Sequence, residues 1–198
     1  MPPRYILERR LPRRALSGKT NYRKRLKIVK SGKPRLVVRR TNKYVIVQIV
    51  ESRRGGDYTA LTVTTRALRQ YGWRGGTKST PAAYLAGFMA GKLALQKGYS
   101  EAIVDFGLHP SHPGSRLYAA VKGALDAGLS IPVGEGVLPS DERIRGQHIA
   151  DFLKIVKGSG NATQFHALDP EYIESLPKHF EEVKQKIAQG GPGLNLLQ

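Results

Sequence analysis

The sequence of 198 residues contains no cysteine, and this absence excludes several classes of protein. A disulfide-stapled scaffold, a zinc finger with thiolate ligands and an enzyme with a cysteine nucleophile all need this residue. A chain of this length needs no staple, because a domain of about 150 residues already buries roughly 70% of its unfolded surface. We therefore expect a hydrophobic core to hold the fold.

Long hydrophobic runs are also missing. The first residues, Met1 to Arg4, lack the apolar run of a signal peptide, which predicts a cytoplasmic protein. The most apolar segment, residues 80–97, is interrupted by Lys92 and falls short of the about 18 apolar residues of a membrane span. Residues 1–54 contain no Trp or Phe, side chains that a surface-lying membrane helix sets opposite its charges. Membrane is therefore not the expected partner.

Acidic residues are scarce, and their distribution is uneven. The chain has 33 Lys or Arg against 15 Asp or Glu, a net charge of +18. Residues 1–54 hold 18 of the basic residues and two acids, a net charge of +16, which leaves +2 for residues 55–198. A nearly neutral globule with a strongly basic first quarter is typical of a chain that meets nucleic acid with one end.

The first quarter predicts an arm followed by a basic helix. Residues 1–18, rich in Arg and Pro, are expected to form an extended arm that orders on its partner. Residues 20–31 predict a helix with Thr20 as N-cap and an apolar stripe of Tyr22, Leu26 and Val29. Arg23, Lys24, Lys27 and Lys30 take the rest of the circumference, which is typical either of a solvated charged face or of a nucleic-acid-binding helix. No acid interleaves these cations, which favours binding.

Three strands are expected next, within residues 34–65. Segments 34–40, 44–52 and 58–65 are rich in Val, Ile and Thr and are separated by two turns. Both turns begin with a pair of arginines, whose planar forks bind phosphates at a loop tip.

A long buried helix is predicted over residues 80–97, with Thr80 as N-cap and Pro81 as its first residue. Small residues recur on it at a spacing of four, so another element can approach closely, and we expect that element to be a sheet; they are Ala83, Gly87 and Gly91.

The second half of the chain predicts a parallel crossover and then further helices. A buried strand over 102–106, a helix over 116–127 with Ser115 as N-cap and a strand over 131–133 form the crossover. A helix over 140–157 is expected to break at Gly146. The central α/β domain then spans 19–157, and residues 158–198 form a helical extension, opened by Asp169-Pro170, with a frayed tail.

No catalytic constellation is apparent. His109 and His112 lie in a loop with two prolines and no neighbouring carboxylate, a poor frame for a metal. His148 could act as a general base, but no nucleophile for it is identifiable in the sequence. It is interpreted as a helix-capping or RNA-contacting residue. A two-metal nuclease needs several converging carboxylates, whereas Asp105 is the only acid within a predicted buried strand. We expect no enzyme activity, metal, cofactor or small-molecule substrate.

Four motifs, in this order, resemble the family of the large-subunit ribosomal protein eighteen, which binds 5S ribosomal RNA, in its archaeal branch. They are Tyr22-Arg23-Lys24-Arg25-Leu26, Lys33-Pro34-Arg35-Leu36-Val37-Val38 with Asn42-Lys43, Ala124-Leu125-Asp126-Ala127-Gly128-Leu129, and Arg145-Gly146-Gln147-His148-Ile149. The resemblance covers residues 15–155. It implies a three-layer α/β/α fold with a mixed sheet and ribonuclease H-like topology, without the nuclease site.

The resemblance also implies a function and partners. The protein is expected to join 5S rRNA to the large-subunit rRNA in the central protuberance of the ribosome, beside neighbouring ribosomal proteins that include large-subunit protein five. A free RNA chaperone or annealing factor with the same basic surface remains the alternative.

The residues expected to bind RNA lie on the arm, the basic helix and the two turns. They are Arg9, Arg10, Arg13, Arg14, Lys19, Asn21, Tyr22, Arg23, Lys24, Arg25, Lys27, Lys30, Lys33, Arg35, Arg39, Arg40, Asn42, Lys43, Arg53 and Arg54. Cations and small polar donors suffice, because A-form duplexes are recognised through phosphates, 2′-hydroxyls and shape. Tyr22 and Tyr44 either stack on unpaired bases or pack against the hydrophobic face.

Overall fold

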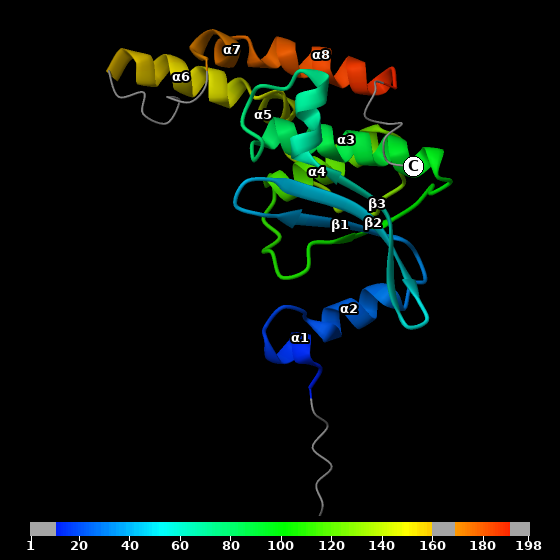
Figure 1. Cartoon of the computed structure of the whole chain (residues 1–198). Helices are drawn as coiled ribbons and strands as arrows, with labels where there is room; N and C mark the ends of the chain where they lie inside the picture. The colour runs from blue at the N-terminus through cyan, green and yellow to red at the C-terminus, as the bar shows by residue number, and fades with distance from the viewer. Residues whose placement is uncertain (1–10, 160–168, 191–198) are drawn as a thin grey trace, which may run out of the picture.

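A mixed four-stranded sheet carries helices on both sides, which confirms the predicted α/β class (Figure 1). The computed structural model describes residues 11–159 and 169–190. The strands are β1 (Arg35–Arg40), β2 (Val45–Arg53), β3 (Gly56–Thr64) and β4 (Ile103–Asp105), in the order β3-β2-β1-β4. The first three pair antiparallel, as the two predicted turns require, and β4 runs parallel to β1.

The predicted strand over 131–133 is wrong. Only an isolated parallel bridge between Glu101 and Ser130 stands in its place. Pro132 has no amide hydrogen to donate to a sheet ladder, so the pairing stops after one bridge. β4 is consequently an edge strand, and its Ile103 and Val104 are only half-buried, although we expected both of its faces to be covered.

The long helix α3 (Thr80–Gln96) is buried between the sheet and other helices. Its N-cap is Ser79, whose hydroxyl accepts a hydrogen bond from the Ala82 amide at 3.3 Å; the predicted cap, Thr80, lies inside the helix.

The small residues of α3 face α4 (Arg116–Asp126), whereas we expected them to face a sheet. A Cβ at Gly87 would lie 1.9 Å from the Ala120 carbonyl oxygen, and one at Gly123 would lie 2.1 Å from the Tyr84 carbonyl oxygen. Glycines on both helices thus bring the two backbones into contact. The large side chains of α3 remain available to cover β2 and β3.

The C-terminal helices complete the core on the side away from the sheet (Figure 1). They are α5 (Asp141–Arg145), α6 (Gln147–Ser159), α7 (Pro170–Glu174) and α8 (Leu176–Ala188). The predicted break at Gly146 is confirmed, since this residue adopts φ +85° between α5 and α6. α8 packs on α3 through Phe180, which is 1% exposed. The predicted frayed tail, residues 191–198, lies outside the described residues.

Two short helices lie on the opposite face of the sheet (Figure 1). Residues 13–18, expected to be extended, contain α1 (Arg13–Leu16), and α2 (Tyr22–Val29) follows. Asn21 caps α2 by accepting a hydrogen bond from the Lys24 amide at 3.1 Å, which corrects the predicted Thr20. α2 buries no residue, and Leu26 of its predicted apolar stripe is 58% exposed. Tyr22, Ile28 and Val29 are half-buried, so hydrophobic burial holds α2 only in part.

None of the helices in the two described segments is long and apolar enough to cross a membrane.

Candidate nucleic-acid interface

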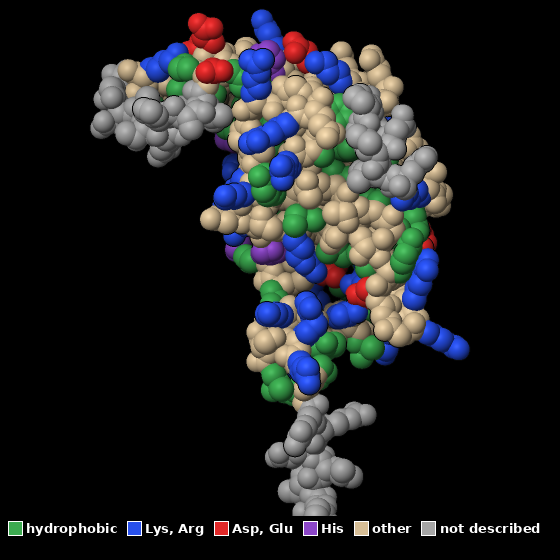
Figure 2. Space-filling view, in the orientation of Figure 1, with side chains coloured by type: hydrophobic (Ala, Val, Ile, Leu, Met, Phe, Trp, Pro, Cys, Tyr) green, Lys and Arg blue, Asp and Glu red, His purple; other side chains and the backbone are tan. Residues whose placement is uncertain are grey.

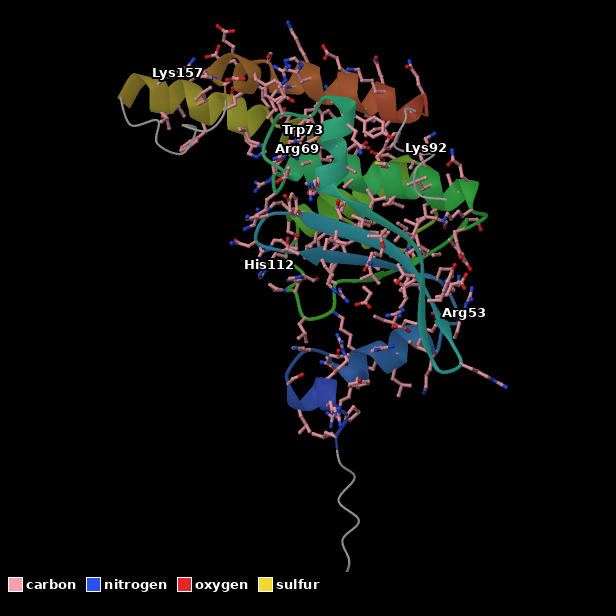
Figure 3. The ribbon with its side chains drawn as sticks, viewed as in Figure 1. Arg53, Arg69, Trp73, Lys92, His112 and Lys157 are labelled. Carbon is pink, nitrogen blue, oxygen red and sulfur yellow. The ribbon has the colours of Figure 1, made fainter. Side chains whose placement is uncertain are left out.

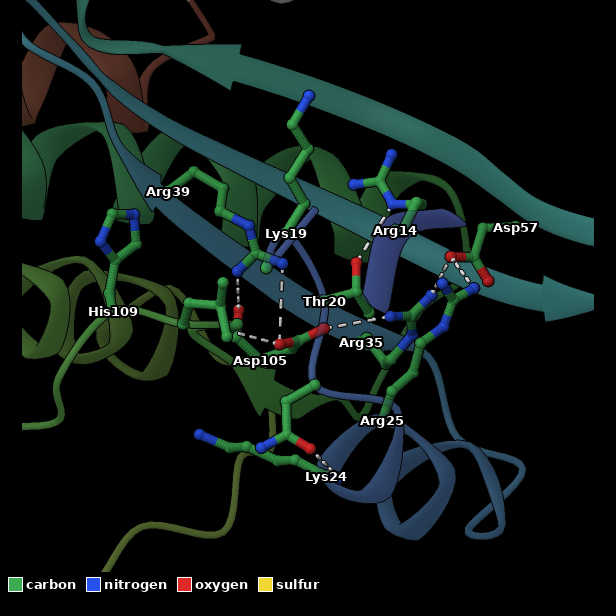
Figure 4. A pocket seen from close by; sticks show the side chains of 14 residues that line it. Arg14, Lys19, Thr20, Lys24, Arg25, Arg35, Arg39, Asp57, Asp105 and His109 are labelled. Carbon is green, nitrogen blue, oxygen red and sulfur yellow. Dashed lines mark hydrogen bonds and ion pairs between the residues drawn. The ribbon is translucent and has the colours of Figure 1, made fainter. Parts of the chain in front are cut away.

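A cleft of about 640 Å³ separates α1 and α2 from the sheet (Figure 4). Side chains alternate between the faces of a strand, so Leu36 and Val38 of β1 enter the core while Arg35 and Arg39 point into the cleft. Six cations and two carboxylates line it; they are Arg14, Lys19, Lys24, Arg25, Arg35 and Arg39, with Asp57 and Asp105. The cleft is thus cationic.

The two carboxylates are held inside a chain of ion pairs (Figure 4). Asp57 Oδ2 lies 2.7 Å from both Arg25 Nη2 and Arg35 Nη2. Arg35 Nη1 donates to Asp105 Oδ2 at 3.0 Å, and Arg39 Nη1 donates to the Asp105 carbonyl at 2.9 Å. The chain joins α2, β1, β3 and β4. Through Arg25 it links α2, which has no fully buried residue, to the sheet.

Arg35, one of the candidate RNA ligands, is engaged within the protein. It is 4% exposed, and its guanidinium contacts both Asp57 and Asp105. Partial burial alone would raise the pKa of Asp57, but contact with Arg35 and the charges of Arg35 and Arg25 lower it below its usual value. Asp57 is therefore an anion at neutral pH, and Arg25 and Arg35 neutralise its charge.

Other cations of the cleft remain open to solvent. Arg14, Lys19 and Lys24 are exposed, and none of them pairs with a carboxylate in the part of the chain that the structure describes. Arg14 donates to the Thr20 hydroxyl at 3.1 Å, and both residues line the cleft.

The remaining predicted residues on α1, α2 and the β1–β2 turn are also exposed. They are Arg13, Asn21, Arg23, Lys27, Lys30, Arg40, Asn42 and Lys43. Tyr22 and Tyr44 are half-buried, so part of each side chain remains in solvent. Arg9 and Arg10 lie outside the described residues.

Intramolecular contacts occupy two further predicted cations. Lys33 pairs with Glu101 at 2.5 Å. Arg53 stacks 3.8 Å above the centroid of the Tyr58 ring and pairs with Glu51 at 2.9 Å (Figure 3 labels Arg53). Arg54, the next residue, is exposed. At the β2–β3 turn, Arg54 is therefore open to solvent, whereas Tyr58 and Glu51 hold Arg53 in place.

Sequence reasoning missed the part played by His109. Its Nε2 accepts a hydrogen bond from the Arg40 amide at 3.2 Å, which ties the loop after β4 to the end of β1. Burial, and then the charges of Arg39 and Arg40, lower the pKa of His109. The proline-rich sequence around it indicates a loop, but nothing local in the sequence indicates its distant partner.

No group of three or more His, Asp or Glu in the described segments is placed to hold a metal ion. Asp57 and Asp105 bind arginines. An α/β body with an acid-poor cationic face, whose carboxylates are neutralised internally, is the architecture of a structural nucleic-acid-binding protein.

Comparison with known proteins places the chain within this class. The family described as ribosomal large subunit proteins 60S L5 and 50S L18 matches residues 7–101. Large ribosomal subunit protein uL18 of Thermofilum pendens is 52% identical over 183 residues, covering 89% of this chain and 93% of the relative. The uL18 protein of Methanothermobacter thermautotrophicus is 44% identical over 191 residues, covering 93% and 96%. The chain belongs to the uL18 family of large-subunit ribosomal proteins.

Membership confirms the resemblance seen in the four motifs. The protein is a constituent of the large ribosomal subunit, where the family binds ribosomal RNA, and it is not an enzyme. Both named relatives are archaeal, in agreement with the predicted branch.

Proposed function

We propose that the protein binds 5S rRNA and links it to the large-subunit rRNA in the central protuberance, beside large-subunit protein five. The observation that supports this most directly is the cationic face made by α1, α2 and the cleft. There, exposed Lys and Arg side chains stand beside carboxylates that are already neutralised.

The chemistry of this face suits folded RNA. A duplex in the A form exposes phosphates and 2′-hydroxyls, which ammonium and guanidinium groups bind without reading base edges. α2 presents Arg23, Lys24 and Lys27 on one short rigid element. Arg40 and Lys43 at the β1–β2 turn supply a second set of cations from the sheet. Cations on two separate elements allow contact with more than one RNA segment.

Selective binding tests the 5S assignment. The affinity of the purified protein for 5S rRNA is measured against an unrelated RNA of the same length, at moderate salt with competitor RNA. We expect tighter binding to 5S rRNA. Equal affinity would refute the assignment and favour a free RNA chaperone, which would also sediment with large subunits at much less than one copy per particle.

A matched pair of variants tests the surface. Lys24→Gln removes an open cation of the cleft, whereas Lys154→Gln removes one on α6 that pairs with Asp151 at 3.6 Å. Each phosphate contact adds about 0.9 to the slope of log affinity against log salt in duplex DNA. We expect Lys24→Gln to reduce the slope by about that amount and Lys154→Gln to leave it unchanged. Equal slopes for both variants would contradict the proposed surface.

A further inference from the structure

A second basic groove lies next to the cleft, at the end of the sheet where the β1–β2 turn meets α4 and α5. Arg40 lines it from β1, Arg116 and Ser115 from the start of α4, and Arg143 from α5. His112 also lines it and is labelled near the β1–β2 turn in Figure 3. In Figure 2, basic and histidine side chains gather along this edge of the body.

The charges of this groove are not balanced within it. Three arginines line it, and no Asp or Glu does among the described residues. Arg116 Nη1 donates to the Lys78 carbonyl at 2.9 Å, which fixes its half-buried guanidinium in the groove wall. Burial, and then the charge of Arg40, lower the pKa of Arg116. Clustered cations without a counter-charge favour a bound anion.

Two carboxylates near the groove, Asp141 and Glu181, pair with other residues. Asp141, at the start of α5, pairs with Lys122. Arg145, two residues after Arg143, pairs with Glu181 at 3.3 Å. Arg143 itself makes no ion pair within residues 11–159 and 169–190. The same short helix therefore carries one neutralised arginine and one open to a ligand.

The start of α4 adds uncharged donors to the arginines. Ser115 occupies the N-cap position, but its hydroxyl caps no amide of the helix. Its Oγ is buried and has no hydrogen-bond partner in the described residues. A hydroxyl in this position can donate to an anion that the arginines attract.

We infer that this groove binds a phosphodiester of an RNA backbone through Arg40, Arg116 and Arg143. The inference rests on the proposed RNA-binding function. His109 lines both the groove and the cleft, so one RNA segment can run from one into the other. The planar fork of arginine matches the paired oxygens of a phosphate, which favours RNA over an acidic protein segment as the ligand.

The salt dependence of RNA binding tests the groove through a matched pair on one helix. Arg143→Gln removes the open arginine, and Arg145→Gln removes the paired one, with the same change in charge. Affinity for 5S rRNA is measured from 50 to 200 mM salt. Loss of one phosphate contact lowers the change in affinity over this range by about 3.5-fold. We expect this for Arg143→Gln and no change for Arg145→Gln.

Further variants and probes keep the result interpretable. Arg116→Lys retains the charge but loses the fork, so we expect weaker binding with an unaltered salt slope. Thermal unfolding of each variant confirms that the fold is intact. Unchanged affinity and slope in Arg143→Gln would overturn the inference and leave an acidic protein neighbour as the partner. Competition by inorganic phosphate as strong as by RNA would also overturn it, because the site would then take a free ion.

Failure of the 5S assignment is a separate outcome. A protein that binds 5S rRNA and unrelated RNA equally can still show the Arg143 effect, because a phosphate contact carries no sequence information.

Discussion

Substitution of Asp57 by Asn tests whether the ion-pair chain holds α2 on the sheet. The carboxylate contacts Arg25 and Arg35, each at 2.7 Å, and the Arg35 side chain is only 5% exposed. Asparagine keeps the size of the side chain and removes the charge. Arg35 then retains Asp105 as its only carboxylate partner, at 3.0 Å.

The size of the effect follows from the intermediate burial of Asp57, whose side chain is 29% exposed. Removing one partner of a fully buried pair costs about 3–5 kcal/mol, and exposed pairs contribute about 0–1 kcal/mol. We therefore expect the free energy of unfolding to fall by about 2 kcal/mol, because Arg35 stays paired with Asp105. For a domain of this size, that loss lowers Tm by about 4–8 °C.

Urea unfolding at 25 °C measures this loss, with Asp141→Asn as the control. Asp141 is 75% exposed and pairs with Lys122 at the surface, so we expect a smaller change there. The pKa of Asp57 is lowered in the folded protein, so its stabilising contribution is complete above the ordinary value near pH 4 and is lost as the pH falls further. Asp57→Asn lacks this acid-dependent step. Equal losses of stability in the two variants would refute the reasoning.

Two further predictions concern the α3–α4 contact and the loop after β4. Gly87→Ala sets a Cβ 1.9 Å from the Ala120 carbonyl oxygen, so we expect the free energy of unfolding in urea to fall by about 3 kcal/mol. Gly56→Ala is the control, and we expect little change there because its Cβ meets no atom within 4 Å. Equal losses would contradict this packing. The lowered pKa of His109 predicts that its NMR titration midpoint lies below about 6.5, and that its stabilising contribution is lost as the pH falls through that midpoint. A midpoint above about 6.5 would disprove this.

Local patterns predicted most of the elements. The Val- and Ile-rich runs correspond to β1 and β2, and the break at Gly146 appears where it was expected. Patterns were less reliable for caps, since Ser79 and Asn21 cap their helices instead of the neighbouring threonines. Adjacent residues with similar hydroxyl or amide groups compete for the same position, and the approach of the chain to the helix decides between them.

Partners distant in the sequence escaped prediction. Glycines at a spacing of four show that something approaches α3 closely, but not that it is α4. Likewise, Arg35 looks like its neighbours in a basic run. Its removal from the surface depends on Asp57 and Asp105, which are 22 and 70 residues away.

The amino-acid sequence by itself indicated an anionic partner and predicted the segment that meets it, because net charge and its distribution along the chain can be read without the fold. The tertiary structure decided which cations remain open. Ion pairs between residues of α2, β1, β3 and β4 neutralise the charge of the buried Arg35. Lys24, which lines the same cleft, stays in solvent. The tertiary structure also brought Arg40, Arg116 and Arg143 into one groove, a proximity that depends on the packing of α4 against β1 and of α5 against α3.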